Sequence, residues 1–148
     1  MPDPASTLLF QRRTPILNRV ALRAFAQRLA IEVAAGREFT CLFGGDIKLR
    51  RLNRDFLGKD YATDVLSFPS GSAAGPLGDL AISLERAEAQ AAEFGHTVED
   101  EICVLMLHGV LHLTGEDHEA DSGQMQRLES RWRSHFGLPA GLIERVHV

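Results

Sequence analysis

The sequence predicts one α+β domain with a small mixed sheet of about four strands, covered by about five helices. Short segments of β-favouring residues are interspersed with longer segments whose apolar residues recur at helical spacing. Residues 98–114 are apolar nearly all round, which is typical of a central buried helix. A chain of 148 residues fits a single domain with a substantial core, so we expect residues 1–148 to form one domain.

The first half of the chain alternates strand and helix patterns. Gly36 ends the first helical pattern, and Asp46 is a residue type that can cap the second. Pro69 stops the last strand of this half. We expect strands at 7–11, 38–43 and 64–68, and helices at 15–35 and from Asp46 onwards.

The second half is mainly helical. A strand at 79–83 leads to Ser83, which can cap a helix that ends before Gly95. Thr97 with Asp100 resembles a capping box at the start of the buried helix. A last helix, at about 121–136, has an apolar stripe that we interpret as core.

Composition excludes several classes of protein. Apolar residues make up 45% and charged residues 24%, as in ordinary globular domains. No apolar run approaches membrane-spanning length, and the first residues lack the pattern of a signal peptide. Cys41 and Cys103 have no CxxC partner, which favours a reducing compartment, and we expect a cytoplasmic protein. The net charge of −4 argues against general capture of nucleic acid, although a local basic patch can still bind phosphates.

Three of the six histidines lie in the stretch "HGVLHLTGEDH". His108 and His112 are four residues apart and share one helix face. Gly115 permits a left-handed turn that can bring His118 back towards them. Three converging imidazoles with an open fourth position are typical of catalytic zinc, so we predict one Zn²⁺ per chain. The alternative is that the three histidines are unrelated, and that each is either hydrogen-bonded in the core or exposed to water.

The stretch has the spacing of a metzincin protease but lacks its general base. Those enzymes carry Glu directly after the first His, where this chain has Gly109. We therefore expect a zinc hydrolase that is not a protease. A proton acceptor or charge stabiliser must come from elsewhere, and the candidates are Glu101, Glu116 and Asp117. Helix-end solvation, turn formation or a hydrogen bond to a ligand histidine would explain the same carboxylates.

At this point the sequence resembles a known family. "HGVLHLTGEDH" resembles the H-G-x-L-H-L-x-G-x-D-H signature of the YbeY endoribonucleases, also called rRNA maturation factors. "LNRDFLGKDYATDVLSFP" at 52–69 and "GDLAIS" at 78–83 resemble two further blocks of that family, and Glu101 fits as well. The matched motifs cover roughly residues 38–135.

The resemblance implies a cytoplasmic bacterial zinc enzyme that cuts single-stranded RNA. Its expected partners are ribosomal RNA and the small ribosomal subunit, with a role at the 3′ end of the small-subunit RNA and in ribosome quality control. No membrane or DNA partner is expected. The family's three metal ligands correspond to His108, His112 and His118. Glu101 and Asp117 remain the candidate catalytic carboxylates.

One position departs from the family pattern. The aromatic residue of the second block is usually followed by arginine, thought to serve the RNA cleavage site, but here Phe56 is followed by Leu57. Another cation can take that role, and Arg54, one helical turn before Leu57, is the first candidate. Lys59 is the second. The basic residues of this segment are equally compatible with a solvated helix face: Lys48, Arg50, Arg51, Arg54 and Lys59.

Three functions remain open from the sequence. The first is a zinc-dependent, single-strand-specific endoribonuclease. The second is a metal-bearing ribosome-assembly or RNA-binding factor with little catalysis, which the acidic net charge and Leu57 favour. The third is a hydrolase of small substrates or peptides, which Gly109 disfavours.

Overall fold

Four strands form one mixed sheet in the order β1-β2-β4-β3. The computed structural model describes residues 6–11, 16–117, 120–140 and 142. β2 pairs in parallel with β1 and with β4, and β3 runs antiparallel along β4. The predicted small mixed sheet is therefore confirmed. The strands are β1 (Thr7–Phe10), β2 (Phe39–Gly44), β3 (Val65–Pro69) and β4 (Gly78–Ser83).

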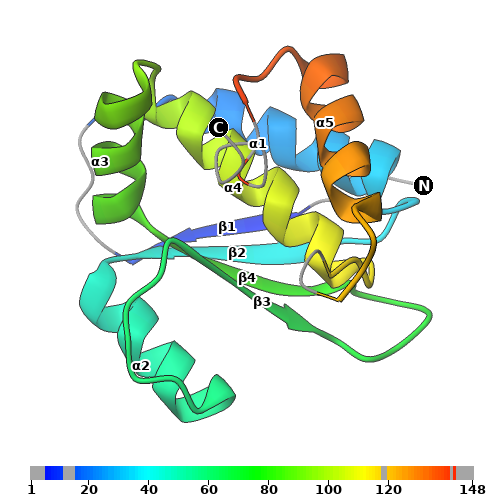
Figure 1. Cartoon of the computed structure of the whole chain (residues 1–148), viewed down its shortest axis with the longest axis horizontal. Helices are drawn as coiled ribbons and strands as arrows, with labels where there is room; N and C mark the ends of the chain where they lie inside the picture. The colour runs from blue at the N-terminus through cyan, green and yellow to red at the C-terminus, as the bar shows by residue number, and fades with distance from the viewer. Residues whose placement is uncertain (1–5, 12–15, 118–119, 141, 143–148) are drawn as a thin grey trace.

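The helices cover the sheet unequally. Figure 1 shows α1, α3, α4 and α5 above one face of the sheet, with α2 alone beneath the other. Both faces of the central strands must therefore be apolar, and β4 is buried at five of its six residues. The bounds are α1 (Arg19–Arg28), the π-helical turn η1 (Leu29–Val33), α2 (Asp46–Leu57), α3 (Leu84–Phe94), α4 (Val98–Leu113) and α5 (Gln124–Phe136).

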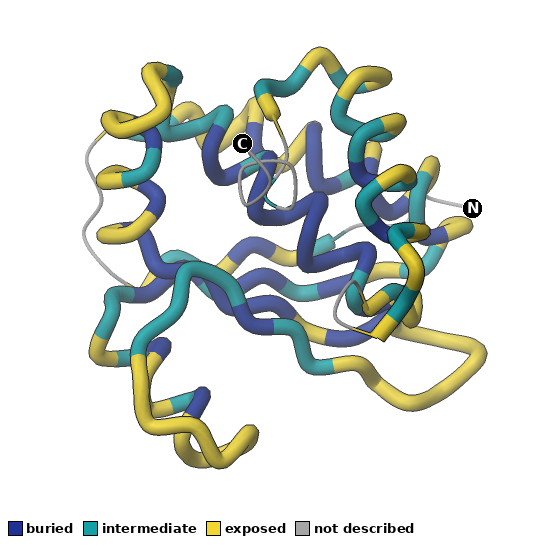
Figure 2. Tube along the Cα trace, viewed as in Figure 1, coloured by how far each residue is buried: buried dark blue, intermediate teal, exposed yellow. Residues whose placement is uncertain are grey.

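Helix α4 is the central helix of the fold, as its all-round apolar sequence predicts. Eleven of its 16 residues are buried, and Figure 2 shows it as a dark blue segment between the sheet and the outer helices. It packs against β3, β4, α3, α5 and α1. Within the described residues, no helix has the length and apolar composition needed to cross a membrane.

The predicted starts of α3 and α4 are confirmed by their hydrogen bonds. The Ser83 and Thr97 side chains accept from the backbone N–H groups of Arg86 and Asp100. The expectation for Asp46 is wrong. Gly45 holds the cap position of α2, and the Asp46 carboxylate instead accepts from the Ser83 hydroxyl at 2.6 Å. That bond ties the start of α2 to the end of β4.

Two helices begin later than expected, and in each case a side chain explains the start. Asn18 caps α1 by accepting from Ala21 N–H, which sets the first helical residue at Arg19 rather than near Pro15, which lies outside the described residues. The Asp121 carboxylate accepts from Gly123 and Met125 N–H, so residues 121–123 form a turn before α5.

Gly109 allows α4 to lie close to the sheet. A Cβ atom at this position would come within 2.7 Å of Leu80 Cδ2 and 3.3 Å of Val65 Cγ2. The Gly109 carbonyl also accepts a hydrogen bond from the Ser67 hydroxyl, at 3.1 Å. The small residue beside His108 is therefore needed for packing against β3 and β4.

Candidate functional site

Two imidazoles meet at the C-terminal end of α4. His108 is 5% exposed and His112 is half-buried. Their Nε2 atoms lie 3.2 Å apart, because residues four apart on a helix stand one turn above each other. Two imidazole nitrogens bound to one tetrahedral zinc are about 3.3 Å apart, given Zn–N distances of about 2.0–2.1 Å. The pair therefore has the spacing that one zinc ion requires.

A buried carboxylate from α5 fixes the orientation of His108. Glu129 is 1% exposed and lies 2.7 Å from His108 Nδ1. A carboxylate only accepts hydrogen bonds, so we assign the proton to Nδ1, which leaves the Nε2 lone pair directed at His112. Carboxylate–histidine pairs of this kind orient metal ligands. Sequence reasoning missed Glu129, although it stands as a charged residue within the apolar stripe of α5.

The two histidines open into a hollow of about 610 Å³. One wall comes from β3 and the residues before it, and another from the C-terminal end of α2 and the loop after it. The turn after α4 completes it, and Gly115 there has a φ of +104°, as its predicted turn role requires. The described lining residues are Asn53, Leu57, Lys59, Tyr61, Thr63, Asp64, Val65, Leu66, Ser67, Pro69, His108, His112, Gly115, Glu116, Asp117 and Leu142.

The third predicted ligand, His118, lies outside the described residues. Among the residues that are described, no three His, Cys, Asp or Glu side chains converge as a metal site would require. The fit to zinc therefore rests on the His108–His112 pair and on the Glu129 contact. The predicted ligand set stays a proposal.

The three candidate carboxylates lie in two different places in the structure. Asp117 and Glu116 both line the hollow beside the histidines. Glu101 is fully buried elsewhere, near the start of α4, where its two oxygens lie 2.7 Å from Gln90 Nε2 and 2.6 Å from His96 Nε2. Glu101 is not among the described lining residues. His96, which looks ordinary in the sequence, is a partner of that carboxylate.

The two candidate phosphate-binding residues, Lys59 and Arg54, also lie in different places. Lys59 lines the hollow, and it is the sole Lys or Arg among the described lining residues. Arg54 does not line it, and its Nε atom lies 3.1 Å from the Asp55 carboxylate on the exposed side of α2. Leu57 lines the hollow beside Lys59, so an apolar side chain stands where a cation was expected. The geometry favours Lys59 over Arg54.

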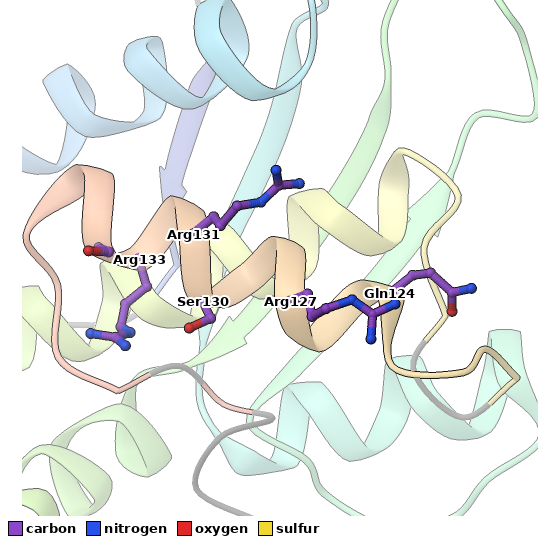
Figure 3. Close-up of a pocket in the computed structure, with 6 residues that line it drawn as sticks. Gln124, Arg127, Ser130, Arg131 and Arg133 are labelled. Atoms are coloured by element: carbon purple, nitrogen blue, oxygen red, sulfur yellow. The ribbon is translucent and has the colours of Figure 1, made fainter.

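A second hollow, of about 710 Å³, lies on the outward face of α5. Its described lining residues include three arginines, and Figure 3 shows their side chains spread along the helix. Helical spacing places Arg127 and Arg131 opposite Glu129, so these two arginines point away from His108, whereas Arg133 lies one turn after Glu129. This second hollow contains neither histidine of the pair. The described lining residues are Gln124, Arg127, Ser130, Arg131, Arg133 and Ser134.

Fold and hollow together define a class: a small α+β enzyme domain whose imidazole pair faces an open cavity from the central helix. The model of the family "Endoribonuclease YbeY" matches residues 11–137. The chain therefore belongs to the endoribonuclease YbeY family.

Curated relatives and a solved structure agree with this assignment. The chain is 65% identical to endoribonuclease YbeY of Solibacter usitatus over 95% of both chains. It is 41% identical to that of Koribacter versatilis, over 94% of this chain and 91% of the relative. A solution structure of a Thermotoga maritima protein superposes with a TM-score of 0.59 at 26% identity, over 87% of this chain and 92% of that one.

Proposed function

We propose that the protein is a zinc-dependent endoribonuclease that cuts single-stranded RNA in the cytoplasm, with small-subunit ribosomal RNA as its substrate. The observation that carries the proposal is the His108–His112 pair, braced by Glu129 and open to a hollow. Family membership supports the reaction class, because the relatives are named endoribonucleases. The small ribosomal subunit and the 3′ end of its RNA follow from the sequence resemblance and belong to this proposal.

The metal would be held by His108, His112 and His118, with residues 1–148 acting as one domain. When bound, zinc supplies a water of lowered pKa and polarises a phosphoryl oxygen. Glu129 keeps the His108 proton on Nδ1, so that Nε2 remains a ligand lone pair. Metal ligation requires an imidazole nitrogen with a free lone pair, and the Nδ1 contact with Glu129 orients His108 for that role.

Two other polar residues of the hollow are candidates for proton transfer and for phosphate binding. Asp117 is our candidate for the proton acceptor, because it lines the hollow beside the histidines. Lys59 is our candidate for binding the phosphate whose charge grows during cleavage. Glu101, with Gln90 and His96 as its partners, fits a role in positioning the start of α4 better than contact with substrate.

Leu57 favours one alternative function. A lysine ammonium is a point charge that cannot bind a phosphate bidentately as arginine does, and the hollow has an apolar side chain where that arginine was expected. A metal-bearing factor that binds ribosomal RNA during assembly, with little catalysis, would tolerate this composition.

The deciding experiment compares three proteins purified without added zinc. Wild type, His112→Ala and the control His135→Ala are analysed for metal content and assayed on a single-stranded RNA and on its duplex. His135 lies on the exposed side of α5 and bonds to Glu32. We expect about one zinc per chain and single-strand cleavage in wild type and in the control, with both lost in His112→Ala. Zinc without cleavage in wild type would support the assembly factor, and zinc retained by His112→Ala would refute the metal site.

A further inference from the structure

Exposed apolar side chains gather at the rim of the histidine hollow. Within the described residues, nine large apolar side chains are exposed, and three of them lie between residues 56 and 61. Phe56 is 69% exposed, Leu57 46% and Tyr61 54%. Leu57 and Tyr61 line the hollow, and Phe56 directly precedes Leu57 in α2. Single exposed apolar residues are common on protein surfaces, but a group beside a functional cavity indicates a binding surface.

The loop that carries Tyr61 is held in place from α2. The buried Asn53 side chain donates to the Tyr61 carbonyl at 3.0 Å, and the Asn53 carbonyl accepts from Lys59 N–H at 3.2 Å. Arg50 binds the Asp60 carboxylate through two nitrogens, at 2.8 and 3.2 Å. These contacts hold Lys59, Asp60 and the Tyr61 carbonyl against α2. An aromatic ring is thus presented to water by a rigid support, which lowers the entropy cost of binding a partner.

The chemistry of this rim suits one nucleotide of a flexible strand. Tyr61 offers a flat aromatic face, Leu57 an apolar contact and Lys59 a cation, and all three line the same hollow. Within the described residues, the Lys59 ammonium makes no ion pair. Base stacking on aromatic side chains together with phosphate contact by cations is how single-stranded nucleic acids are bound without base pairing. A purely apolar peptide would leave Lys59 without a counter-charge.

We propose that Tyr61 stacks on an unpaired base of the RNA, with Leu57 against the base edge and Lys59 on the adjoining phosphate. This proposal rests on the proposed function. It explains how a hollow with one described cation can select single strands, since a base within a duplex has no free face to stack. Leu57 then contributes to substrate binding through its apolar surface.

The test measures RNA binding rather than cleavage. Zinc-loaded wild type, Tyr61→Phe and Tyr61→Ala are titrated at low temperature with a short single-stranded RNA and with an abasic strand of the same length. A gel of the same samples checks that the strand stays intact. Phe94→Ala is the matched control, because Phe94 is an exposed aromatic residue at the far end of α3.

We expect Tyr61→Ala to weaken binding of the base-bearing strand by about 5- to 100-fold, and Tyr61→Phe and Phe94→Ala to leave it nearly unchanged. Wild type should bind the abasic strand more weakly, and Tyr61→Ala should cause no further loss on that strand. Equal losses on both strands, or none on either, would overturn the stacking proposal while leaving the endoribonuclease intact. Base-dependent binding by a wild type that fails the cleavage assay of the proposed function would refute the endoribonuclease and leave the stacking proposal intact. Failure of wild type to bind any single strand would refute both.

Discussion

His108 Nδ1 and the Glu129 carboxylate lie 2.7 Å apart in the interior, which joins α5 to the imidazole pair of α4. Both side chains are almost fully buried, at 5% and 1% exposure. The contact therefore links packing of the last helix to the geometry of the site.

We expect Glu129→Gln to lower zinc affinity about 10- to 100-fold, because the substitution removes the negative charge that holds the proton on Nδ1. Glu129→Ala should in addition destabilise the metal-free protein by about 1–3 kcal/mol, since it leaves a buried N–H without an acceptor. Metal competition titration and urea unfolding measure the two effects. Glu88→Gln, an exposed substitution on α3, is the control. Unchanged zinc affinity in both Glu129 variants would show that the contact is only structural.

Gly109→Ala should destabilise the fold by about 1–2 kcal/mol, even though alanine favours helix over glycine. The added Cβ atom would lie 2.7 Å from Leu80 Cδ2, so the Leu80 side chain, which is 1% exposed, would have to shift within the packed core. Gly109→Glu should destabilise the fold more than Gly109→Ala does, and it should not create peptidase activity. Unfolding curves of Gly109→Ala, Leu80→Ala and the double variant test this, and the two losses should be less than additive. A Gly109→Ala protein as stable as wild type would contradict the close-packing argument.

Lys59→Ala should lower kcat/KM for RNA cleavage by about 100-fold, the order of effect when one charge-stabilising group is removed. Arg54→Ala should have a smaller effect, because Arg54 points to Asp55 outside the hollow. Leu57→Arg should raise cleavage if phosphate binding limits the rate. Lys48→Ala, at the other end of α2, controls for net charge. If Arg54→Ala is the more damaging change, phosphate approaches from the outer side of α2.

The two thiols should be unreactive in the folded protein. Burial raises the pKa of Cys41, and burial together with the nearby Asp100 and Glu99 carboxylates raises the pKa of Cys103 to about 12. Near pH 8 the thiolate fraction of Cys103 is then about a thousandfold below that of a free cysteine. Iodoacetamide labelling of folded and urea-unfolded protein, followed by mass spectrometry, checks this. Rapid labelling of Cys103 in the folded state would contradict it.

The same shift has a consequence for stability. The pKa of Cys103 is higher in the folded protein than in the unfolded chain. The contribution of Cys103 to the free energy of unfolding is therefore fully present below about pH 9. It is lost as pH rises towards 12, because the unfolded state releases its proton first. Unfolding curves of wild type and Cys103→Ala between pH 8 and 11 should therefore converge as pH rises.

The sequence predicted those parts of the fold that depend on local chemistry. Apolar periodicity located α4, and Ser83, Thr97 and Gly95 marked helix ends that the structure confirms. The π-helical turn after α1 could not be predicted, because its five residues have ordinary helical spacing. The role of Asp46 also depended on a distant partner, Ser83, which only the folded sheet brings near.

In the candidate site, too, contacts between residues close in sequence could be predicted, and contacts made by packing of distant elements could not. His108 and His112 are four residues apart, so their proximity follows from helix geometry alone. Glu129 is 21 residues away and reaches His108 only because α5 packs across α4. Glu101 shares a helix face with His108 in sequence, but two helical turns separate them, and its nearer partners are Gln90 and His96.

Because α4 is both the centre of the core and the carrier of the imidazole pair, it should behave as one cooperative unit with the rest of the fold. Its amide protons should exchange with solvent only through global unfolding. We therefore expect metal-free protein to keep the same slow-exchanging amides in α4. Loading the site would raise the melting temperature by mass action, without any ordering of that helix.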